Sequence, residues 1–521
     1  MPELEKNSDV DSLHLGKENV AMNETVEADA REMGDVSGET RGTWRFWLLI
    51  VAISALTLSY AVTRSFVWDE GYHLMAAQQI SLGKLPYLDF CFPQTPLNAF
   101  LNAGIIRIFG QHWQAVHVAA ALFTIGAMLL TAQYVLTRFP VQRWRLACAL
   151  CAAVFVGLNE VVLQFATAGQ AYGICLFFSV AAYRLALATP ARVSVWLPLG
   201  CGLLAGIAAD SSLLTAPILP VLLIWLWRYD RVGLPFRKVL AFVVGVGLAF
   251  LPVLWLYIKN PEQTLFNIVR YHALYRRVDW PSAMANHHDL LVFTSLVDST
   301  QALTLALLAI AGLVFLMRRC DWARAEKGAF YLAAWIAAAE GAYLCTPHPT
   351  FGRYYLLLVP FLTIVGMAGL YSIACQMGYA AVPKKPALIA GGLMSLMFTN
   401  YLAQMSDQTT WQEYETLAKK VAAVTPKGGR IFADELVYFA MGVSPPSGME
   451  CSYTHALALP PREERLEHLV SEAELKQQFA RHEFDTIQSC SDPEMERLGP
   501  GSYPHKQDVD ECTIYWVGAN K

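Results

Sequence analysis

Two adjacent carboxylates, Asp69 and Glu70, come directly after the first long apolar run of the chain. Holding a carboxylate beside a bilayer costs free energy, so ionisable groups kept there usually serve a function. A carboxylate within hydrogen-bond reach of a hydroxyl can accept its proton while the oxygen attacks a carbon centre. Asp89 follows close enough in sequence to share a cavity with the pair. These residues predict acid–base chemistry at a membrane surface.

The composition predicts a membrane protein that holds these residues in place. Hydrophobic residues make up 55% of the 521 residues and charged residues 16%, against roughly 25% charged in ordinary soluble domains. The net charge of −4 and the lack of a basic stripe with interleaved aromatic residues argue against a nucleic-acid partner. We therefore expect a mainly α, polytopic bundle of transmembrane helices.

Eleven apolar runs are each long enough to cross a bilayer, which takes about 20 residues. They lie near 44–63, 113–137, 144–161, 166–187, 194–210, 212–227, 239–258, 299–317, 328–345, 354–375 and 386–405. Lys and Arg gather in every second connecting loop, and basic loops stay on the cytoplasmic side. This alternation predicts a cytoplasmic N-terminus, an exoplasmic C-terminus and an acidic pair outside the cytoplasm.

Two of the predicted outer loops, 64–112 and 259–298, are long, and long loops in compact proteins are usually functional. In the first loop, a proline at the start and glycines at the ends mark two short helices, 71–82 and 96–109. Neither is long enough to span a bilayer. We expect both to lie along the membrane interface or to re-enter the membrane.

The two ends of the chain differ in character from the apolar middle. Residues 1–43 are acidic and poor in aromatic residues, which predicts a disordered cytoplasmic tail. Residues 44–405 form the predicted transmembrane catalytic domain, and 406–521 regain charge and predict a small exoplasmic α/β domain. Its expected helices are 411–424 and 462–480, and its expected strands are 430–433 and 513–517.

Four cysteines fall in predicted exoplasmic segments, namely Cys91, Cys451, Cys490 and Cys512. An oxidising compartment would permit a disulfide there. Pairing of Cys490 with Cys512 is one arrangement that the sequence allows without proving it.

Three further segments extend the acidic pair into a recognisable pattern: residues 83–90 (GKLPYLDF), 93–97 (PQTPL) and 352–360 (GRYYLLLVP). In this order, and on one side of the membrane, they resemble GT-C glycosyltransferases of the protein O-mannosyltransferase and lipid A aminoarabinose transferase type. Among these enzymes the chain resembles the Rhizobium lipopolysaccharide galacturonosyltransferases. The resemblance covers roughly residues 44–405.

The resemblance implies transfer of a sugar from a polyprenyl-phosphate donor to a lipid, polysaccharide or protein acceptor. It places the active site on the periplasmic side of a bacterial inner membrane. Asp69 is then the general base, by match to the first acid of the family's pair. Glu70 orients the acceptor or holds Asp69, and Asp89 is a second acid in the same cavity.

The leaving group in such a reaction is a lipid phosphate, whose developing charge favours a guanidinium clamp. Arg353 is the best candidate for the clamp, and we expect Tyr354, Gln94 and Arg276 to help bind the phosphate. In many relatives a Lys or His occupies the position of Gln94. The neutral amide puts contact between this loop and the donor phosphate in doubt.

Some of these relatives bind a divalent metal with an acid from the first loop and a histidine from the later one. Here His287 and His288 offer imidazoles in the second long loop. Two imidazoles alone make a weak ligand set, because protein metal sites usually have three or four protein ligands. Metal dependence therefore stays open.

Each candidate residue has a competing structural interpretation. The acidic pair could be a solvated interfacial pair or the anionic cap of a short helix, and Arg353 could anchor lipid headgroups from a helix end. Arg276, His287 and His288 could be ordinary loop residues. Two other functional classes also remain, a secondary transporter of a small solute and a non-catalytic membrane scaffold with an exposed sensor domain.

Overall fold

The computed structural model describes residues 44–230, 232–276, 299–318, 320–347, 350–404, 409–455, 457 and 459–518. The predicted tail 1–43 and the metal candidates His287 and His288 lie outside the described residues. The chain forms two compact units, Met1–Ala52 and Ile53–Lys521. Every contact discussed below lies within the second unit.

The apolar part of the chain is mainly helical. Its helices are Trp44–Thr63, α4 (Trp113–Arg138), α5 (Gln142–Gly157), α6 (Glu160–Ala166), α7 (Tyr172–Ala188), α8 (Trp196–Ser211), α9 (Ile218–Arg228), α10 (Pro235–Ala249), α11 (Leu251–Lys259), α15 (Thr300–Arg318), α16 (Arg324–Tyr343), α17 (Val359–Gln376) and α18 (Lys384–Gln404). Short 3₁₀ turns, η1 (Leu213–Thr215) and η3 (Gly352–Leu358), precede α9 and α17. Each of the eleven predicted runs falls on one of these helices or on a consecutive pair.

Some of these helices are long and apolar enough to cross a membrane alone, and others are not. Within the described part of the chain, five helices are long and apolar enough to cross a membrane, or up to seven if each bent pair forms one span. Others are shorter than the roughly 20 residues that a crossing needs; α7 and α8, for example, have 17 and 16 residues. The eleven-span topology therefore stays a prediction.

Both bent pairs have a local cause in the sequence. α10 and α11 meet at an angle of 57°, where Pro252 near the start of α11 cannot donate a backbone hydrogen bond. α5 and α6 meet at 52°, and the side chain of Asn159 caps α6 by accepting from the backbone N–H of Val162 at 3.2 Å. These breaks divide long apolar runs into shorter helices.

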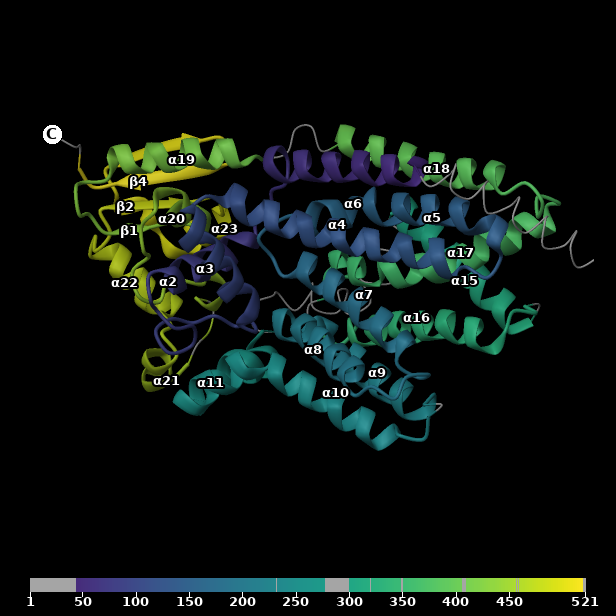
Figure 1. Cartoon of the computed structure of the whole chain (residues 1–521). Coiled ribbons are helices and arrows are strands. Elements are labelled where there is room, and N and C mark those ends of the chain that lie inside the picture. The colour runs from purple at the N-terminus through teal and green to yellow at the C-terminus, as the bar shows by residue number, and fades with distance from the viewer. Residues whose placement is uncertain are drawn as a thin grey trace, which may run out of the picture. The chain divides into compact units, whose positions relative to one another are not determined.

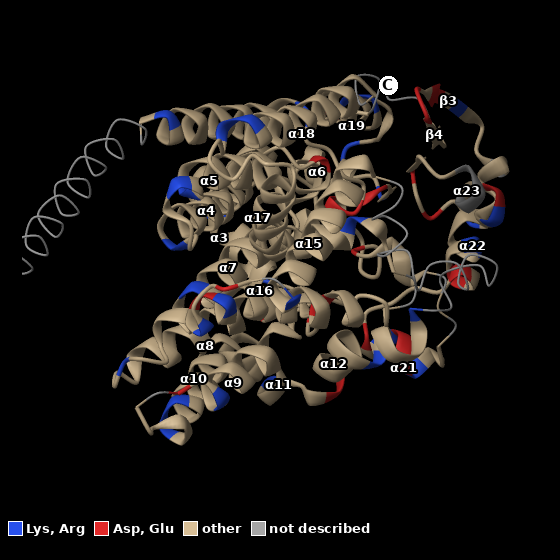
Figure 2. Cartoon of the chain, turned by 90° about the vertical axis from the view of Figure 1, so that its right-hand side faces the viewer, with Lys and Arg blue, Asp and Glu red and all other residues tan. Residues whose placement is uncertain are grey.

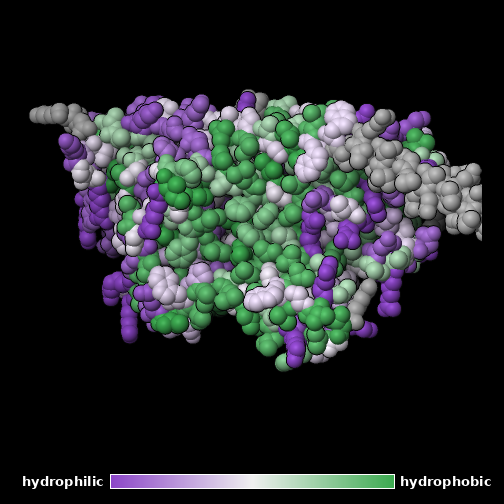
Figure 3. Space-filling model, viewed as in Figure 1, coloured by the Kyte–Doolittle hydropathy of each residue, from purple (hydrophilic) through white to green (hydrophobic). Residues whose placement is uncertain are grey.

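The surface of the protein has separate apolar and polar regions. Hydrophobic side chains fill the middle of the face shown in Figure 3, and hydrophilic side chains gather at its two sides. Lys and Arg occur mainly near helix ends, and the lengths between are largely uncharged (Figure 2). This distribution suits helices whose middles contact lipid and whose ends contact water.

Close helix packing fixes the position of α17, whose preceding turn η3 carries Arg353. A Cβ atom on Gly369 of α17 would lie 1.9 Å from the backbone oxygen of Leu308 in α15. Only glycine permits such an approach of two backbones, and small residues serve this purpose at helix contacts in membranes. The two helices thus hold η3 against a rigid support.

The C-terminal region contains helices and a four-stranded sheet of order β1-β2-β4-β3, and we call it the C-terminal domain. The strands are β1 (Ile431–Phe432), β2 (Thr486–Ser489), β3 (His505–Val509) and β4 (Cys512–Trp516). β1 is parallel to β2, whereas β4 is antiparallel to both β2 and β3. The helices of the domain are α19 (Trp411–Val424), α20 (Glu435–Met441), α21 (Pro461–Leu466), α22 (Glu472–Ala480) and α23 (Asp492–Leu498). Figure 1 shows α19 beside the strands.

One expected helix of this domain is divided in the structure. Residues 462–480 were expected to be helical, but α21 ends at Leu466 and α22 begins at Glu472. His468 between them has a positive φ of 54°. This left-handed conformation interrupts a right-handed helix.

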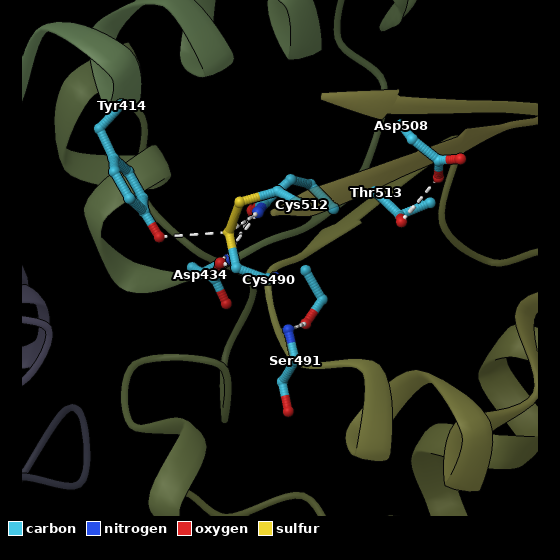
Figure 4. Close-up of a disulfide and its surroundings, with 9 residues drawn as sticks. Tyr414, Asp434, Cys490, Ser491, Asp508, Cys512 and Thr513 are labelled. Carbon is cyan, nitrogen blue, oxygen red and sulfur yellow. Dashed lines mark hydrogen bonds between the residues drawn. A yellow bond between two sulfur atoms is a disulfide. The ribbon is translucent and has the colours of Figure 1, made fainter. Parts of the chain in front are cut away.

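A disulfide joins Cys490 at the end of β2 to Cys512 at the start of β4 (Figure 4). The backbone N–H of Cys490 donates to Asp434 at 3.2 Å, and the hydroxyl of Tyr414 in α19 lies 3.2 Å from Sγ of Cys490. The bond thus ties two strands and α19 together. It is the pairing that the sequence allowed.

Two short helices of the first long loop, α2 (Glu70–Ser81) and α3 (Leu97–Phe109), were expected and are present. The side chain of Gln78 in α2 donates to the backbone oxygen of Val443 at 3.1 Å. Apolar residues of α2 and α3 share one buried cluster with α19 and α20. The C-terminal domain therefore covers the loop that carries the acidic pair.

Reporter fusions will test the predicted topology. Fusions at Arg143, Arg231 and Lys384 are expected to report a cytoplasmic position because these residues lie in basic loops. Fusions at Lys84 and after Asp407 are expected to report an exoplasmic position. Paired phosphatase and fluorescent-protein reporters measure this directly, and an exoplasmic result at Arg231 would exclude the eleven-span topology.

Candidate active site

A cavity of about 410 Å³ lies where the first long loop, the turn η3 and the C-terminal domain meet. Five of the residues proposed from the sequence line this cavity, although they come from four separate segments of the chain. They are Asp69, Gln94, Arg276, Arg353 and Tyr354. Glu70 and Asp89 are not among its lining residues.

Asp69 directs its carboxylate into the cavity. It is the N-cap residue of α2, yet its side chain makes no capping hydrogen bond. Instead, Oδ2 forms an ion pair with Nη2 of Arg353, and Oδ1 accepts a hydrogen bond from the hydroxyl of Tyr453 at 2.5 Å. The carboxylate is thus oriented by a cation and a phenol, with 23% of the side chain exposed.

Arg353 is held between aromatic rings and retains an unused hydrogen-bond donor. Its guanidinium lies 4.5 Å from the ring centre of Phe351 and 5.5 Å from that of Phe165. Among the residues that the structure describes, its buried Nε has no hydrogen-bond partner. A guanidinium has five N–H donors in a planar fork, so Arg353 can contact Asp69 and an anion at the same time.

Another part of the cavity lining comes from η2 (Phe266–Tyr275) and the residue after it. Nη2 of Arg276 donates to the hydroxyl of Tyr354 at 3.0 Å. Burial and the neighbouring Arg276 lower the pKa of His272 to about 4, so its imidazole is neutral at pH 7. Nε2 of His272 lies 2.9 Å from the backbone oxygen of Pro93 and must carry the proton there.

His73 is a second neutral imidazole on the cavity wall. Burial lowers its pKa to about 4, and its ring stacks on Tyr72 at a centroid distance of 4.2 Å. Its Nδ1 is buried without a hydrogen-bond partner in the described structure. His73 therefore lines the cavity without adding charge.

Glu70 lies behind Asp69, where both it and its partner His117 are fully buried. Oε1 of Glu70 is 2.5 Å from Nε2 of His117, and Nδ1 of His117 is 2.8 Å from the backbone oxygen of Ala61. A carbonyl oxygen only accepts hydrogen bonds, so Nδ1 carries a proton and the Glu70–His117 contact shares another. This pair fixes the first turn of α2, which places Asp69.

Asp89 shapes a turn outside the cavity lining. Its Oδ2 accepts from the backbone N–H of Leu85 at 2.7 Å. In the same turn Tyr87 adopts a positive φ of 72° and donates its hydroxyl to the backbone oxygen of Gln94 at 2.5 Å. The structure thus gives Asp89 a position from which it orients the segment that carries Gln94.

Tyr453 is the cavity residue that no local sequence pattern marks, because it lies 384 residues from Asp69 in the chain. It belongs to the 3₁₀ turn η4 (Ser452–Thr454), in which the backbone N–H of Ser452 donates to Glu435 of α20 at 2.7 Å. α20 in turn packs against Gly71, where an added Cβ would lie 3.1 Å from the side chain of Leu436. This close approach brings the C-terminal domain near enough for Tyr453 to contact Asp69.

The metal candidates cannot be placed in this arrangement, since His287 and His288 lie outside the described residues. In the part of the chain that is described, no group of three or more His, Cys, Asp and Glu side chains could hold a metal ion. The carboxylate of Asp69 is already paired with Arg353. The described side chains alone do not fit a metal site, and the metal stays a prediction.

Comparison with known proteins finds likeness in fold but not in sequence. No protein-family profile matches the chain, and no curated protein matches it. Among solved structures, ArnT from Cupriavidus metallidurans in the apo state has a TM-score of 0.63 and 12% identity, covering 92% of this chain and 98% of ArnT. The same enzyme bound to undecaprenyl phosphate has a TM-score of 0.61 and 13% identity, covering 91% and 98%.

An archaeal oligosaccharyltransferase, from Archaeoglobus fulgidus in complex with Zn and sulfate, also matches, with a TM-score of 0.53 and 15% identity. The match covers 86% of this chain and 68% of that protein. Both neighbours are GT-C glycosyltransferases. The fold that the sequence resemblance implied is therefore confirmed.

Proposed function

We propose that this protein is a membrane glycosyltransferase that moves a sugar from a polyprenyl-phosphate donor to an acceptor hydroxyl. The reaction takes place at the outer face of a bacterial inner membrane. The observation that carries the proposal is the Asp69–Arg353 pair in a cavity beside the apolar helices. A base for the acceptor and a cation for the donor phosphate are adjacent there, within a fold shared with ArnT.

The geometry supports a direct displacement. The acceptor hydroxyl gives its proton to the carboxylate of Asp69 as its oxygen bonds to the anomeric carbon of the sugar. The bond between that carbon and the phosphate oxygen breaks, and the electron pair stays with the leaving polyprenyl phosphate. The guanidinium of Arg353 holds the developing phosphate charge together with that of Arg276, and both lie near the ring of Phe351.

Residues around the pair keep this arrangement in place. The Glu70–His117 contact holds the start of α2 and so limits the movement of Asp69. His73 and His272 are neutral at pH 7, so they add no charge that would compete with Arg353 for the donor. The acceptor fills the space beside Tyr453 and Tyr72, whose rings meet edge to face at 5.7 Å. Aromatic faces of this kind pack well against sugar rings through apolar contact.

The test is a transfer assay with purified protein in proteoliposomes. Polyprenyl-phosphate sugars are supplied as donors, and envelope lipids and glycans from a strain that lacks the protein are supplied as acceptors. The expected product is an acceptor whose mass has grown by one sugar residue, formed together with free polyprenyl phosphate. Uptake of a soluble solute without any such product would support a transporter instead.

Tyr453→Phe is expected to lower the turnover number of transfer by about 10-fold to 100-fold. The change removes one hydrogen bond to a charged group, worth about 1.5–3 kcal/mol, and leaves the ring in place. The matched control is Tyr503→Phe. It removes a buried hydroxyl of the same domain, which donates to the backbone oxygen of Phe484 at 2.8 Å. Equal losses in the two variants would mean that Tyr453 acts only through stability of the domain.

A further inference from the structure

A second cavity, of about 660 Å³, lies between α4, α7, α9 and α16. Four arginines line it, and we call them the arginine cluster: Arg138, Arg184, Arg228 and Arg324. Arg138 is the last residue of α4, whose first residue, Trp113, donates to Glu415 of the C-terminal domain at 3.0 Å. A helix of 26 residues is about 39 Å long. The arginine cluster and the C-terminal domain are thus at opposite ends of α4.

The charge of the arginine cluster is not neutralised within the cavity. In the described structure, no ion pair joins any of the four to a carboxylate, and Arg184 donates to the neutral side chain of Gln133 at 2.8 Å. Two carboxylates also line the cavity, but both have other partners. Asp230 pairs with the buried Lys238, and Glu326 accepts the backbone N–H of Ala323 at 3.1 Å.

Two general tendencies explain part of this arrangement. Basic residues collect at cytoplasmic helix ends, and a cation at a helix C-terminus, such as Arg138 or Arg228, is favoured by the helix dipole. The helix dipole does not account for Arg324, which is the first residue of α16. A cation at a helix N-terminus opposes the dipole, whereas a bound anion there is favoured.

The remaining walls suit the glycerol and first methylene groups of a lipid. Trp225 and Tyr229 of the cavity lining stack at a centroid distance of 4.2 Å, and such rings are enriched at the headgroup level of membranes. On the same helix, the side chains of Ile224 and Trp227 are exposed, at 62% and 54%. An apolar helix surface therefore continues outward from a cationic cavity.

We propose that the arginine cluster binds the phosphate groups of an acidic phospholipid in the leaflet away from the candidate active site. Guanidinium groups bind phosphate oxygens in pairs, and basic pockets between transmembrane helices on the cytoplasmic side bind anionic headgroups. Four guanidiniums match a headgroup with two phosphates better than one with a single phosphate. The bound lipid contacts four helices at the end of α4 that lies away from the C-terminal domain.

The test measures lipid binding to the purified full-length protein by native mass spectrometry. Cardiolipin, phosphatidylglycerol and phosphatidylcholine are titrated separately against the wild type and an Arg138→Gln/Arg228→Gln variant. We expect cardiolipin to bind the wild type most tightly. Each arginine removed should weaken cardiolipin binding about five-fold, so the double variant should lose about 25-fold. Phosphatidylcholine should bind weakly to both proteins.

The control is Arg143→Gln/Arg318→Gln, which removes two exposed arginines from α5 and α15 that do not line the cavity. It should keep wild-type affinity for cardiolipin, and melting temperatures without added lipid should agree for all three proteins. If the control loses as much affinity as the cluster variant, the lipid is attracted by the overall positive charge of this surface. The arginine cluster is then not a specific lipid site. Competition by inorganic pyrophosphate at the same concentration as cardiolipin would show a soluble anion as the ligand and overturn the lipid assignment.

Discussion

Asp69→Asn is expected to abolish sugar transfer while leaving a folded, membrane-inserted protein that still binds its lipid donor. The amide keeps the size of the carboxylate and can still accept the hydroxyl of Tyr453, but it lacks the basicity needed to take a proton. Loss of a general base typically lowers a rate about 10²–10⁴-fold. The ion pair with Arg353 is lost as well, so we expect the larger end of that range. Product formation from a labelled polyprenyl-phosphate sugar measures the rate.

The matched control for this variant is Asp321→Asn, an exposed aspartate before α16 that does not line the candidate active site. It should express, insert and turn over donor as the wild type does. Donor binding by the two variants should also agree within a few-fold, because neither change removes a cation. Wild-type turnover in Asp69→Asn would refute the catalytic assignment and restore the transporter and scaffold hypotheses.

Arg353→Ala is expected to lower transfer about 10²–10³-fold, as the loss of one preorganised donor to a developing anion does in other enzymes. It also leaves the carboxylate of Asp69 without its cation. Arg353→Lys should recover only part of the rate, because an ammonium keeps the charge but not the planar fork or the stacking on Phe351. A higher KM for donor would measure the loss of donor binding, and a lower turnover number would measure the loss of charge stabilisation during transfer.

Arg107→Lys is the control for the arginine substitutions. Arg107 lies in α3, and its guanidinium donates to the backbone oxygens of Ser81 at 3.1 Å and Ile80 at 2.9 Å, away from the cavity lining. This change should alter stability slightly and leave the KM for donor unchanged. An unchanged dependence on donor concentration in Arg353→Ala would reduce Arg353 to a headgroup anchor.

Much of the helical framework could be predicted from hydropathy alone. The runs 113–137 and 299–317 match α4 and α15 to within one or two residues, because an apolar run of that length has few alternatives in a bilayer. The number of crossings stays a prediction. Breaks such as that at Pro252 divide an apolar run without lowering its hydropathy, so composition counts one span where the backbone changes direction by 57°.

Some residues of the candidate site could be predicted from the sequence and others could not. Asp69 and Arg353 could be proposed from the sequence because their residue types and their places beside apolar runs already suggest chemistry. The contact of Tyr453 with Asp69 and that of His117 with Glu70 join residues 384 and 47 positions apart. The first contact depends on how α20 packs against α2 and the second on how α4 lies beside α2, and a single sequence carries no local signal for either.

The long separation between Asp69 and Tyr453 also gives the protein a built-in delay during its biogenesis. The ribosome must add 384 more residues after Asp69 before it reaches Tyr453. At about 5–20 residues per second, this takes roughly 20–80 s. Over that interval the nascent chain already carries its acidic pair but lacks the phenol that orients it. Under the proposed function, full activity is expected only after the C-terminal domain has been translated and folded, so truncated or stalled products should be poor enzymes that consume little lipid-linked sugar.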